Sequence, residues 1–201
     1  MLTGAEIKNR DLVAGATDSG YRASRYDVRI ESLIKPEGST VASYILPARG
    51  IVLAVSKKRI VLPGNITGLA MVKTGLCNDG VLALNIGVID PGWEGKVSSF
   101  LVNFNNHERL LTIDDIFLRL TFQQLSSRVS KRAPISDENY MSDRRHQVVG
   151  RFAPTFLNLS EVIASLTDEA LRRWRTAILI CVPPAAFLLA LLTFLLNFAI
   201  L

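Results

Sequence analysis

The segment 85–95 holds the densest group of side chains that could do chemistry. Asp90 could orient or deprotonate a water molecule, and Trp93 could stack on a ring or a sugar. Three glycines in the same segment would let a ligand approach the backbone closely. Asp, Pro and Gly in succession also suit a tight turn, so the residues alone leave both a binding site and a plain turn open.

The elements that must position this segment read as short β-strands. A capping box formed by Thr3 and Glu6 predicts one short N-terminal helix. Runs rich in Val, Ile and Leu then alternate with turn signals. The predicted strands cover residues 26–33, 50–55, 59–62, 81–89, 96–104 and 116–122. This spacing predicts a mainly β domain over residues 1–125, built as an antiparallel barrel or jelly roll. An immunoglobulin-type sandwich is disfavoured, because its Cys and Trp core pattern is missing.

The composition excludes several classes of function. The 201-residue chain has two cysteines, Cys77 and Cys181, and two histidines, His107 and His146, none of them at ligand spacing. We therefore expect no disulfide framework, no metal site made of protein ligands and no zinc. The net charge of +5 is scattered, without a basic stripe interleaved with aromatics, so nucleic acid is not an expected partner.

The part of the chain that follows the β domain changes character twice. Residues 126–157 are polar and interrupted by Pro134 and Pro154, which predicts a linker or wrapping arm without regular structure. Residues 158–175 carry an apolar stripe at spacings of three and four and predict an amphipathic juxtamembrane helix. This stripe could pack on the domain, lie on a membrane or pair with copies of itself.

Residues 176–201 contain no charged side chain. A hydrocarbon core of about 30 Å needs about 20 helical residues, so this stretch predicts one transmembrane helix with membrane lipid around it. Arg172, Arg173 and Arg175 come directly before it. By the positive-inside rule, we expect a C-terminally anchored, single-pass protein whose β domain is cytoplasmic.

Four segments resemble the dCTP deaminase and dUTPase superfamily, over about residues 1–125. Residues 1–7 look like the opening helix of the deaminase branch, and 23–30 (ASRYDVRI) look like its SYDLRLG strand. Residues 87–95 (GVIDPGWEG) are close to the shared GxIDPGxxG motif, and 115–122 (DIFLRLTF) resemble the GDRIAQLVF strand. The resemblance implies a homotrimer of distorted jelly rolls with nucleotide sites between subunits.

The resemblance also implies roles for single residues of the motif. Asp90 matches the dUTPase carboxylate that activates the attacking water, with Mg²⁺ on the nucleotide phosphates. Asn85, Gly87 and Trp93 would then border a pyrimidine deoxynucleotide. Asp27 and Arg29 are expected to be structural.

The phosphate-binding positions depart from the superfamily pattern. Its members place an Arg-Ser-Ser run before the hairpin, where this chain has Lys73, Thr74 and Gly75. A lysine keeps the charge but lacks the bidentate fork that suits phosphate. The arginine that deaminases carry shortly afterwards is Asn78 here. Lys73, Thr74 and Asn78 are thus the candidate phosphate-side residues.

The general-base position of the deaminases departs further, because Phe100 stands where they have Glu. Alternation places Phe100, Val102 and Phe104 on one face of a strand, which predicts an apolar core role. Three hypotheses follow: a nucleotide-binding module with a degenerate catalytic site that acts as a nucleotide sensor or membrane effector; an active dUTP diphosphatase or dCTP deaminase; and a structural membrane oligomer that binds no nucleotide.

Overall fold

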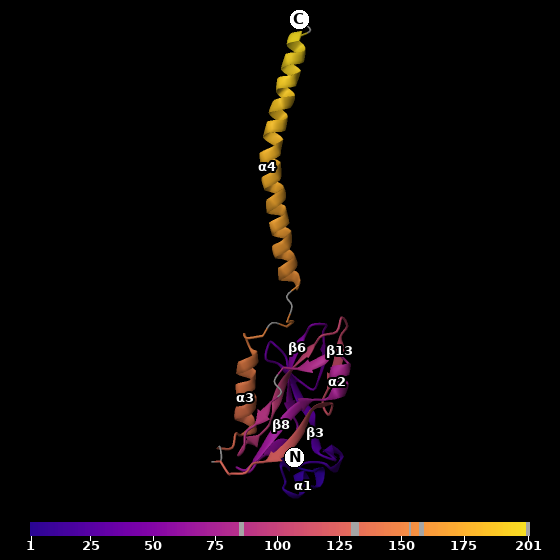
Figure 1. Cartoon of the computed structure of the whole chain (residues 1–201), viewed down its shortest axis with the longest axis vertical. Helices are drawn as coiled ribbons and strands as arrows, with labels where there is room; N and C mark the ends of the chain where they lie inside the picture. Colours follow the sequence, from indigo (N-terminus) through magenta and orange to yellow (C-terminus); the bar gives the residue numbers. More distant parts are fainter. Residues whose placement is uncertain (85–86, 130–132, 153, 157–158, 200–201) are drawn as a thin grey trace. The chain divides into compact units, whose positions relative to one another are not determined.

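The computed structural model describes residues 1–84, 87–129, 133–152, 154–156 and 159–199 (Figure 1). It divides into two compact units, Met1–Leu157 and Asn158–Leu201. The first unit, called the β unit below, holds every described strand and three short helices, and the second unit is one long helix.

The β unit begins with the helix that the capping box predicts. Helix α1 spans Gly4–Asn9, and Thr3 and Glu6 form both bonds of the box. The backbone N–H of Glu6 donates to Thr3 Oγ1 at 3.3 Å, and the backbone N–H of Thr3 donates to Glu6 Oε2 at 2.9 Å. The prediction is confirmed.

One large antiparallel sheet carries the candidate site. Its strands follow the order β10-β8-β14-β3-β6-β12-β9. Their bounds are β3 Arg25–Ile34, β6 Ile51–Ser56, β8 Ile66–Val72, β9 Val81–Ala83, β10 Val88–Ile89, β12 Ser98–Asn103 and β14 Ile116–Gln124. The register shifts between Ile30 and Ser32 and between Ile116 and Leu118. Such irregularities increase the local twist, and they let the sheet curl around its core.

Shorter elements close the ends of this sheet. Strands β2 (Tyr21–Arg22) and β4 (Thr40–Val41) both pair with β3. Separate small sheets join β1 (Val13–Ala14), β7 (Arg59–Val61) and β11 (Glu94–Gly95), and β5 (Ser43–Leu46) with β13 (Arg109–Thr112). A 3₁₀ turn, η1, covers Asp18–Gly20, and helix α2 covers Thr74–Asn78.

The core lies between the curled layers and is almost wholly aliphatic. Every residue of β6 is buried, because that strand is covered on both faces. Phe117 and Phe122 of β14 are the largest fully buried side chains. Burying aromatic and branched side chains at about 25 cal/mol per Å² of apolar area supplies most of the stabilisation of such a unit.

The predicted strands agree with the sheet except at two kinds of place. The expected strand 81–89 divides into β9 and β10, which pair with different neighbours, β12 and β8. Strands β1, β2, β4, β5, β8, β11 and β13 lie outside the predicted ranges. Strand β8 contains Thr67 and Gly68, residues that read as turn-like although the pairing with β14 stabilises them in a strand.

The expectation of a linker without regular structure over residues 126–157 is wrong in its middle. Helix α3 spans Asp137–Val148 there, with Ser136 as its N-cap. Only Tyr140 and Val148 of this helix are buried, so its apolar periodicity is weak in the sequence. The helix belongs to the β unit and packs on Ile34, Leu53 and Val55.

The second unit is helix α4, Leu159–Ala199. It runs without interruption through both ranges that the sequence divides into an amphipathic helix and a membrane span. Among the residues that the structure describes, no helix meets the length and apolarity expected of a membrane span. The predicted span is therefore not supported by the structure.

Candidate functional site

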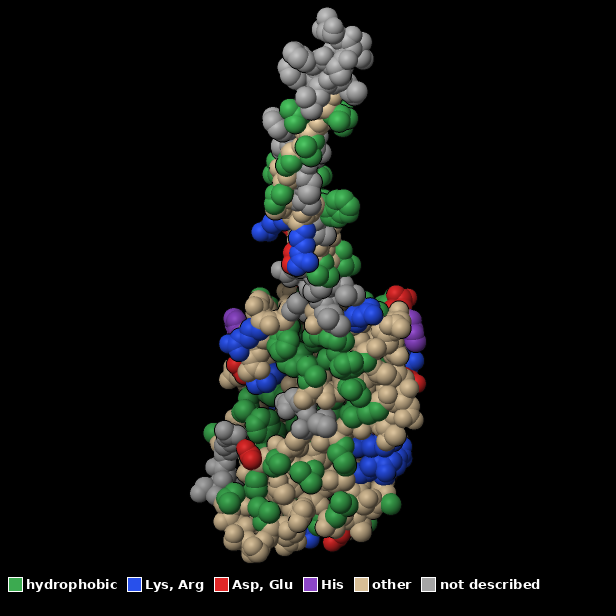
Figure 2. Space-filling model, turned by 45° about the horizontal axis from the view of Figure 1, so that its top comes forward, with side chains coloured by type: hydrophobic (Ala, Val, Ile, Leu, Met, Phe, Trp, Pro, Cys, Tyr) green, Lys and Arg blue, Asp and Glu red, His purple; other side chains and the backbone are tan. Residues whose placement is uncertain are grey.

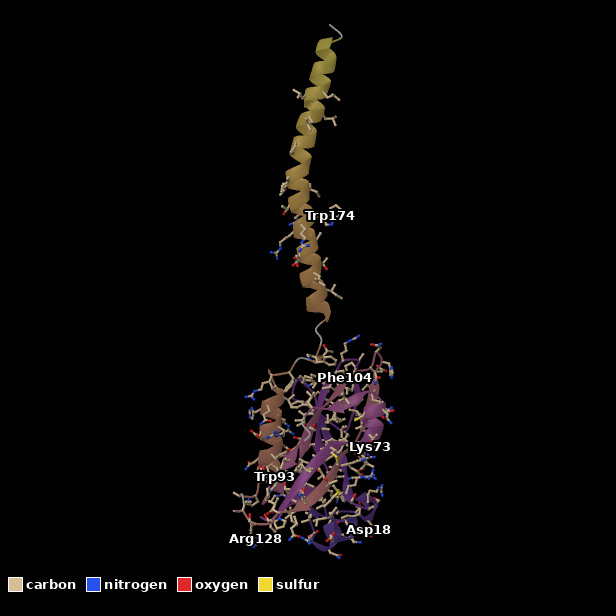
Figure 3. The ribbon with its side chains drawn as sticks, in the orientation of Figure 1. Asp18, Lys73, Trp93, Phe104, Arg128 and Trp174 are labelled. Carbon is tan, nitrogen blue, oxygen red and sulfur yellow. The ribbon has the colours of Figure 1, made fainter. Side chains whose placement is uncertain are left out.

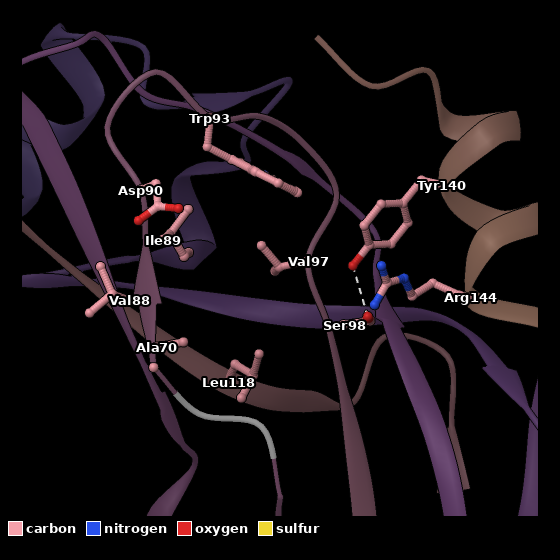
Figure 4. Close-up of a pocket in the computed structure, with 11 residues that line it drawn as sticks. Ala70, Val88, Ile89, Asp90, Trp93, Val97, Ser98, Leu118, Tyr140 and Arg144 are labelled. Carbon is pink, nitrogen blue, oxygen red and sulfur yellow. Dashed lines mark hydrogen bonds between the residues drawn. The ribbon is translucent and has the colours of Figure 1, made fainter. Parts of the chain in front are cut away.

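A cavity of about 230 Å³ opens beside the segment that the sequence singles out (Figure 4). We call it the Asp90 cavity. Its described lining residues come from the β8–β10 side of the sheet, from the turn after β10, from β12 and β14, and from helix α3: Ala70, Gly87, Val88, Ile89, Asp90, Trp93, Val97, Ser98, Leu118, Tyr140 and Arg144.

The turn between β10 and β11 sets the positions of Asp90 and Trp93. Gly92 has φ +79°, a conformation that favours glycine, and the backbone N–H of Trp93 donates to the carbonyl of Asp90 at 3.1 Å. The indole Nε1–H of Trp93 donates to the Gly95 carbonyl at 3.2 Å, which fixes the ring plane. Asp90 is exposed at the cavity mouth. The tight turn that the sequence predicts therefore also lines the Asp90 cavity.

Gly87, the residue directly before strand β10, lines the cavity. A Cβ placed on Gly87 would meet no heavy atom of the described residues within 4 Å. Side-chain packing therefore does not require glycine at this position. Open space beside the backbone is what a ligand that approaches closely would use.

Helix α3 supplies the wall that the sequence does not predict. The hydroxyls of Tyr140 and Ser98 are 2.7 Å apart and share a hydrogen bond, and the Tyr140 ring lies edge-on to Trp93 with centroids 6.5 Å apart. The guanidinium of Arg144 lies over the Tyr140 ring, 5.0 Å from its centroid. In Figure 4 these two α3 side chains face Asp90 and Trp93 across the cavity.

The surroundings of Tyr140 in this wall keep its hydroxyl neutral. Burial raises the pKa of Tyr140, while the hydrogen bond with Ser98 and the charge of Arg144 act to lower it. Tyr140 is therefore a neutral donor or acceptor at physiological pH. Arg144 Nη2 is 2.9 Å from Asp143 Oδ2, while the buried Nε of Arg144 has no hydrogen-bond partner among the described residues.

An ion-pair network fastens the start of α3 to the sheet. Lys96 is 5% exposed and pairs with Glu31 and with Asp137 Oδ2, the latter at 3.3 Å. Arg59 also pairs with Asp137, and its Nη2 donates to the Ile135 carbonyl at 3.2 Å. A buried lysine needs such partners, so this network fixes where α3 begins.

The predicted phosphate-side residues lie elsewhere in the single chain. Lys73 is the N-cap of α2, Thr74 is its first residue and Asn78 its last. Figure 3 labels Lys73 and Trp93 well apart on the β unit. None of the three lines the Asp90 cavity, and Asn78 borders a different hollow with His107 and Arg109. Asn85 lies outside the described residues.

One arginine, Arg119, connects the phosphate-side residue Thr74 with a group of arginines around Asp27. Arg119 Nη1 donates to Thr74 Oγ1 at 2.7 Å, and Arg119 Nε is 3.9 Å from Asp27 Oδ1. Asp27 is buried and also accepts hydrogen bonds from Arg22 and Arg25, at 2.9 and 3.2 Å. The structural role expected for Asp27 fits these contacts. Arg119 is a functional candidate that the sequence analysis misses.

Phe100, at the expected position of a general base, lies in an apolar cluster. It packs with Leu53 and Tyr140, and its ring centroid is 4.2 Å from that of Phe152. Val102 on the same face is buried, but Phe104 is 52% exposed and lies against Phe156. The predicted apolar face is therefore right for Phe100 and Val102, and wrong for Phe104 as a core residue.

The described residues contain no group of three or more His, Cys, Asp or Glu side chains placed to hold a metal ion. Asp90 is the one carboxylate among the described residues lining its cavity. A divalent cation that keeps most of its water and binds nucleotide phosphates would need few protein ligands. Within the described lining, this donor set is too small for a resident metal centre and could contact only the hydration shell of a cation that a ligand brings with it.

The chain is similar in sequence to several dCTP deaminases. A dCTP deaminase of Pyrococcus abyssi is 25% identical over 153 residues, which cover 72% of this chain and 95% of that relative. A dUMP-forming dCTP deaminase of Methanopyrus kandleri is 30% identical over 104 residues, 51% of this chain and 54% of the relative. No family model matches the chain.

A solved structure agrees in fold. The crystal structure of a 2′-deoxycytidine 5′-triphosphate deaminase from Agrobacterium tumefaciens aligns with a TM-score of 0.53 at 11% identity, over 61% of this chain. The comparisons support the dCTP deaminase/dUTPase superfamily. The match spans about half of the Agrobacterium chain, 48%. The expected mainly β, dUTPase-like fold is confirmed, with its sheet curled into half a barrel.

Proposed function

We propose that the Asp90 cavity binds a pyrimidine deoxynucleotide and that the chain acts as a homotrimer. One observation carries the proposal: a cavity lies beside the Asp90 turn, in a chain similar to a dCTP deaminase over 95% of that relative. If the turn were only a turn, we would expect packed side chains at this place. A hollow that combines an indole, hydroxyls, a carboxylate and a guanidinium suits a polar heterocycle.

The lining suggests how a base and a sugar would be held. The Trp93 indole offers a face for stacking, because its Nε1–H is already bound to Gly95. The Ser98 and Tyr140 hydroxyls and the Asp90 carboxylate offer acceptors and donors at the rim. Arg144 adds a cation that is anchored on one side by Asp143.

A second copy of the chain would supply the phosphate end of the site. Lys73, Thr74 and Arg119 lie together on the surface but do not line the Asp90 cavity of their own chain. An arginine presents the planar fork that Lys73 lacks. Arg119 would then compensate for the missing arginine of the superfamily pattern.

Exposed apolar side chains support assembly. Figure 2 shows hydrophobic side chains gathered on one face of the β unit. The described exposed hydrophobics on the neighbouring strands β8 and β10 are Leu69, Met71 and Val88, with Val88 directly opposite Leu69 in the register. An apolar sheet face of this kind suits contact with another subunit better than contact with water.

The residues around Asp90 favour binding without deamination. Phe100 cannot move a proton, and it packs against an apolar cluster that includes Leu53 and against the Phe152 ring. We therefore propose a degenerate site that senses a nucleotide, with the charge-free segment 176–201 as a membrane anchor. The absence of charge over that segment supports the anchor, and Arg172, Arg173 and Arg175 directly before it support a cytoplasmic β unit by the positive-inside rule.

Asp90 itself favours a second candidate, a dUTP diphosphatase. Its carboxylate would take a proton from water as the water oxygen bonds to phosphorus. The bond from that phosphorus to the bridging oxygen breaks, giving dUMP and pyrophosphate, with Mg²⁺ neutralising the phosphate charge when bound. A third candidate, a structural oligomer without a ligand, would leave the cavity unused.

Calorimetric titration of the full chain in detergent separates these candidates. Saturable heat with dCTP, dUTP or dTTP supports binding, and its absence with all of them supports the structural oligomer. Chromatography of the same samples with Mg²⁺ then tests turnover. If dUMP and pyrophosphate form, Asp90→Asn should abolish them while the nucleotide still binds. Unchanged turnover in that variant would remove Asp90 from the reaction.

A further inference from the structure

A second hollow, in another part of the β unit, has a strongly basic lining. Its volume is about 200 Å³, and its described lining residues are Thr17, Ser19, Tyr26, Arg29, Lys57, Lys58 and Asp114. We call it the basic cavity. It shares no residue with the Asp90 cavity and none with the Lys73 group. The proposed nucleotide site therefore leaves it unexplained.

Four separate segments bring these side chains together. Thr17 and Ser19 come from the η1 turn, and Tyr26 and Arg29 come from strand β3. The lysines occupy the turn between β6 and β7, and Asp114 lies in the loop between β13 and β14. Distant parts of the chain thus place mainly charged and hydroxyl-bearing side chains around one hollow.

The charges in the basic cavity are not balanced. Lys57 Nζ is 2.6 Å from Asp114 Oδ1, and this hydrogen bond lowers the pKa of Asp114, which is therefore ionised at neutral pH. Arg29 and Lys58 have no carboxylate within 4.0 Å among the described ion pairs. Three cations against one carboxylate leave a net charge of +2.

Two donors of the basic cavity, Arg29 and Lys57, are held in place by Asp114. Arg29 Nη1 donates to the backbone carbonyl of Asp114 at 2.7 Å, which orients the rest of the guanidinium. Asp114 adopts φ +67°, a strained conformation for a residue other than glycine. The Thr17 and Ser19 hydroxyls lie 3.3 Å apart at the rim. Fixed donors of one sign reduce the entropy cost of binding an anion.

We propose that the basic cavity binds a small phosphate-bearing anion with at least two negative charges. An arginine fork, two ammonium groups and hydroxyls are the donors that recognise phosphate oxygens. Its lining is charged and hydroxyl groups, and its one described aromatic ring, Tyr26, is buried and offers no free face to a base, so the cavity suits inorganic phosphate, pyrophosphate or a small phosphate ester.

Titration of the full chain in detergent with inorganic phosphate and with pyrophosphate tests this proposal. We expect saturable heat for at least one of them at constant ionic strength, and no heat for chloride. Lys58→Gln and Arg29→Gln should each weaken binding about tenfold or more, because each removes a charge-assisted hydrogen bond. Lys35→Gln is the matched control, since Lys35 pairs with Glu37 outside the cavity and its loss changes the net charge equally.

A third variant separates this site from the proposed nucleotide site. Lys73→Gln should leave phosphate binding unchanged. If Lys73→Gln abolishes the heat and Lys58→Gln does not, the anion binds at the nucleotide site and the proposal is wrong. Equal effects of Lys58→Gln and Lys35→Gln, or no heat with the unmodified chain, overturn it too. Vesicles containing phosphatidic acid, added as a competitor, show whether a lipid headgroup can supply the same phosphate.

Discussion

At the residue scale, Trp93 and Tyr140 define the Asp90 cavity from two different elements. The Trp93 ring is fixed by its bond to Gly95, and the Tyr140 hydroxyl is fixed by Ser98. Neither ring needs to reorient for a ligand to enter. We therefore use a substitution of Trp93 to test ligand binding and a substitution of Tyr140 to test stability.

Trp93→Ala should weaken binding of dCTP or dUTP by about tenfold to a hundredfold, because base–aromatic stacking contributes about 1–3 kcal/mol. Calorimetric titration measures the change. Trp174→Ala is the matched control, since Trp174 is the other tryptophan of the chain and is 70% exposed on α4. Equal affinities for both variants would show that the base does not contact Trp93.

Tyr140 predicts a dependence of stability on high pH. Burial raises its pKa above the ordinary value of 10.0, so the unfolded chain loses this proton first as the pH rises. The stabilisation is fully present below about pH 10 and is lost as the pH rises through the folded-state value. Denaturant unfolding between pH 8 and pH 11 should show a smaller decline for Tyr140→Phe than for the unmodified chain. Parallel declines would assign the pH dependence to other groups.

At the element scale, helix α3 supplies the wall of the Asp90 cavity that lies across from the turn. Its first turn is fastened by Lys96 and Arg59, and its buried side chains are few. An element held by ion pairs at one end and by Tyr140 and Val148 along its length should open more readily than the sheet beneath it.

Asp137→Asn should loosen α3 without unfolding the sheet. Lys96, 5% exposed, loses one of its two acidic partners, and Arg59 loses its closest one. After allowance for the exposure of Asp137, we expect a loss of about 1 kcal/mol. Hydrogen exchange over 137–148 should accelerate about fivefold. Glu138→Gln, the neighbouring acid on the same turn, is the control, and an identical exchange rate in both variants would contradict a role for the network.

The sequence predicts the elements whose signals are local. The Thr3 and Glu6 capping box marks α1, an apolar run marks β6, and runs rich in branched and aromatic residues mark β3 and β14. The sequence analysis does not predict helix α3, because the helix has no apolar stripe. Its packing depends on tertiary contacts of two residues, Tyr140 and Val148. A weaker signal was available: Ser136 followed by Asp137 and Glu138 is a helix start, and Arg145 and His146 suit a helix end.

The residues of the candidate site also divide into those that the local sequence predicts and those that it does not. Gly87, Asp90 and Trp93 were predictable because one turn carries them all. Tyr140 and Arg144 reach the cavity from about fifty residues further along the chain, so no local spacing connects them to it. Arg119 is likewise joined to Thr74 only by the pairing of β14 with β8.

At the scale of the whole molecule, the proposed site needs more than one chain. The Asp90 cavity and the Lys73 group face different parts of the surface of one β unit. Light scattering in detergent should therefore give the mass of a trimer. A monomeric mass would contradict a site shared between subunits.

Membrane attachment is the second prediction at this scale. The full chain should sediment with membranes and stay there in alkaline carbonate, because 176–201 lacks any charge. A chain ending at Leu157, the end of the first compact unit, should remain in the supernatant. Release of the full chain by high salt alone would show that the attachment is peripheral.

Photocrosslinking with 5-iodo-dUTP tests the central claim most directly, because light-activated iodouracil couples to aromatic side chains that touch it. The account predicts an adduct on the peptide that carries Trp93 or Tyr140, suppressed by excess dUTP and by dCTP. Digestion and mass spectrometry of the irradiated full chain would identify the modified residue. An adduct elsewhere, or none that competing nucleotide removes, would contradict a nucleotide site in the Asp90 cavity.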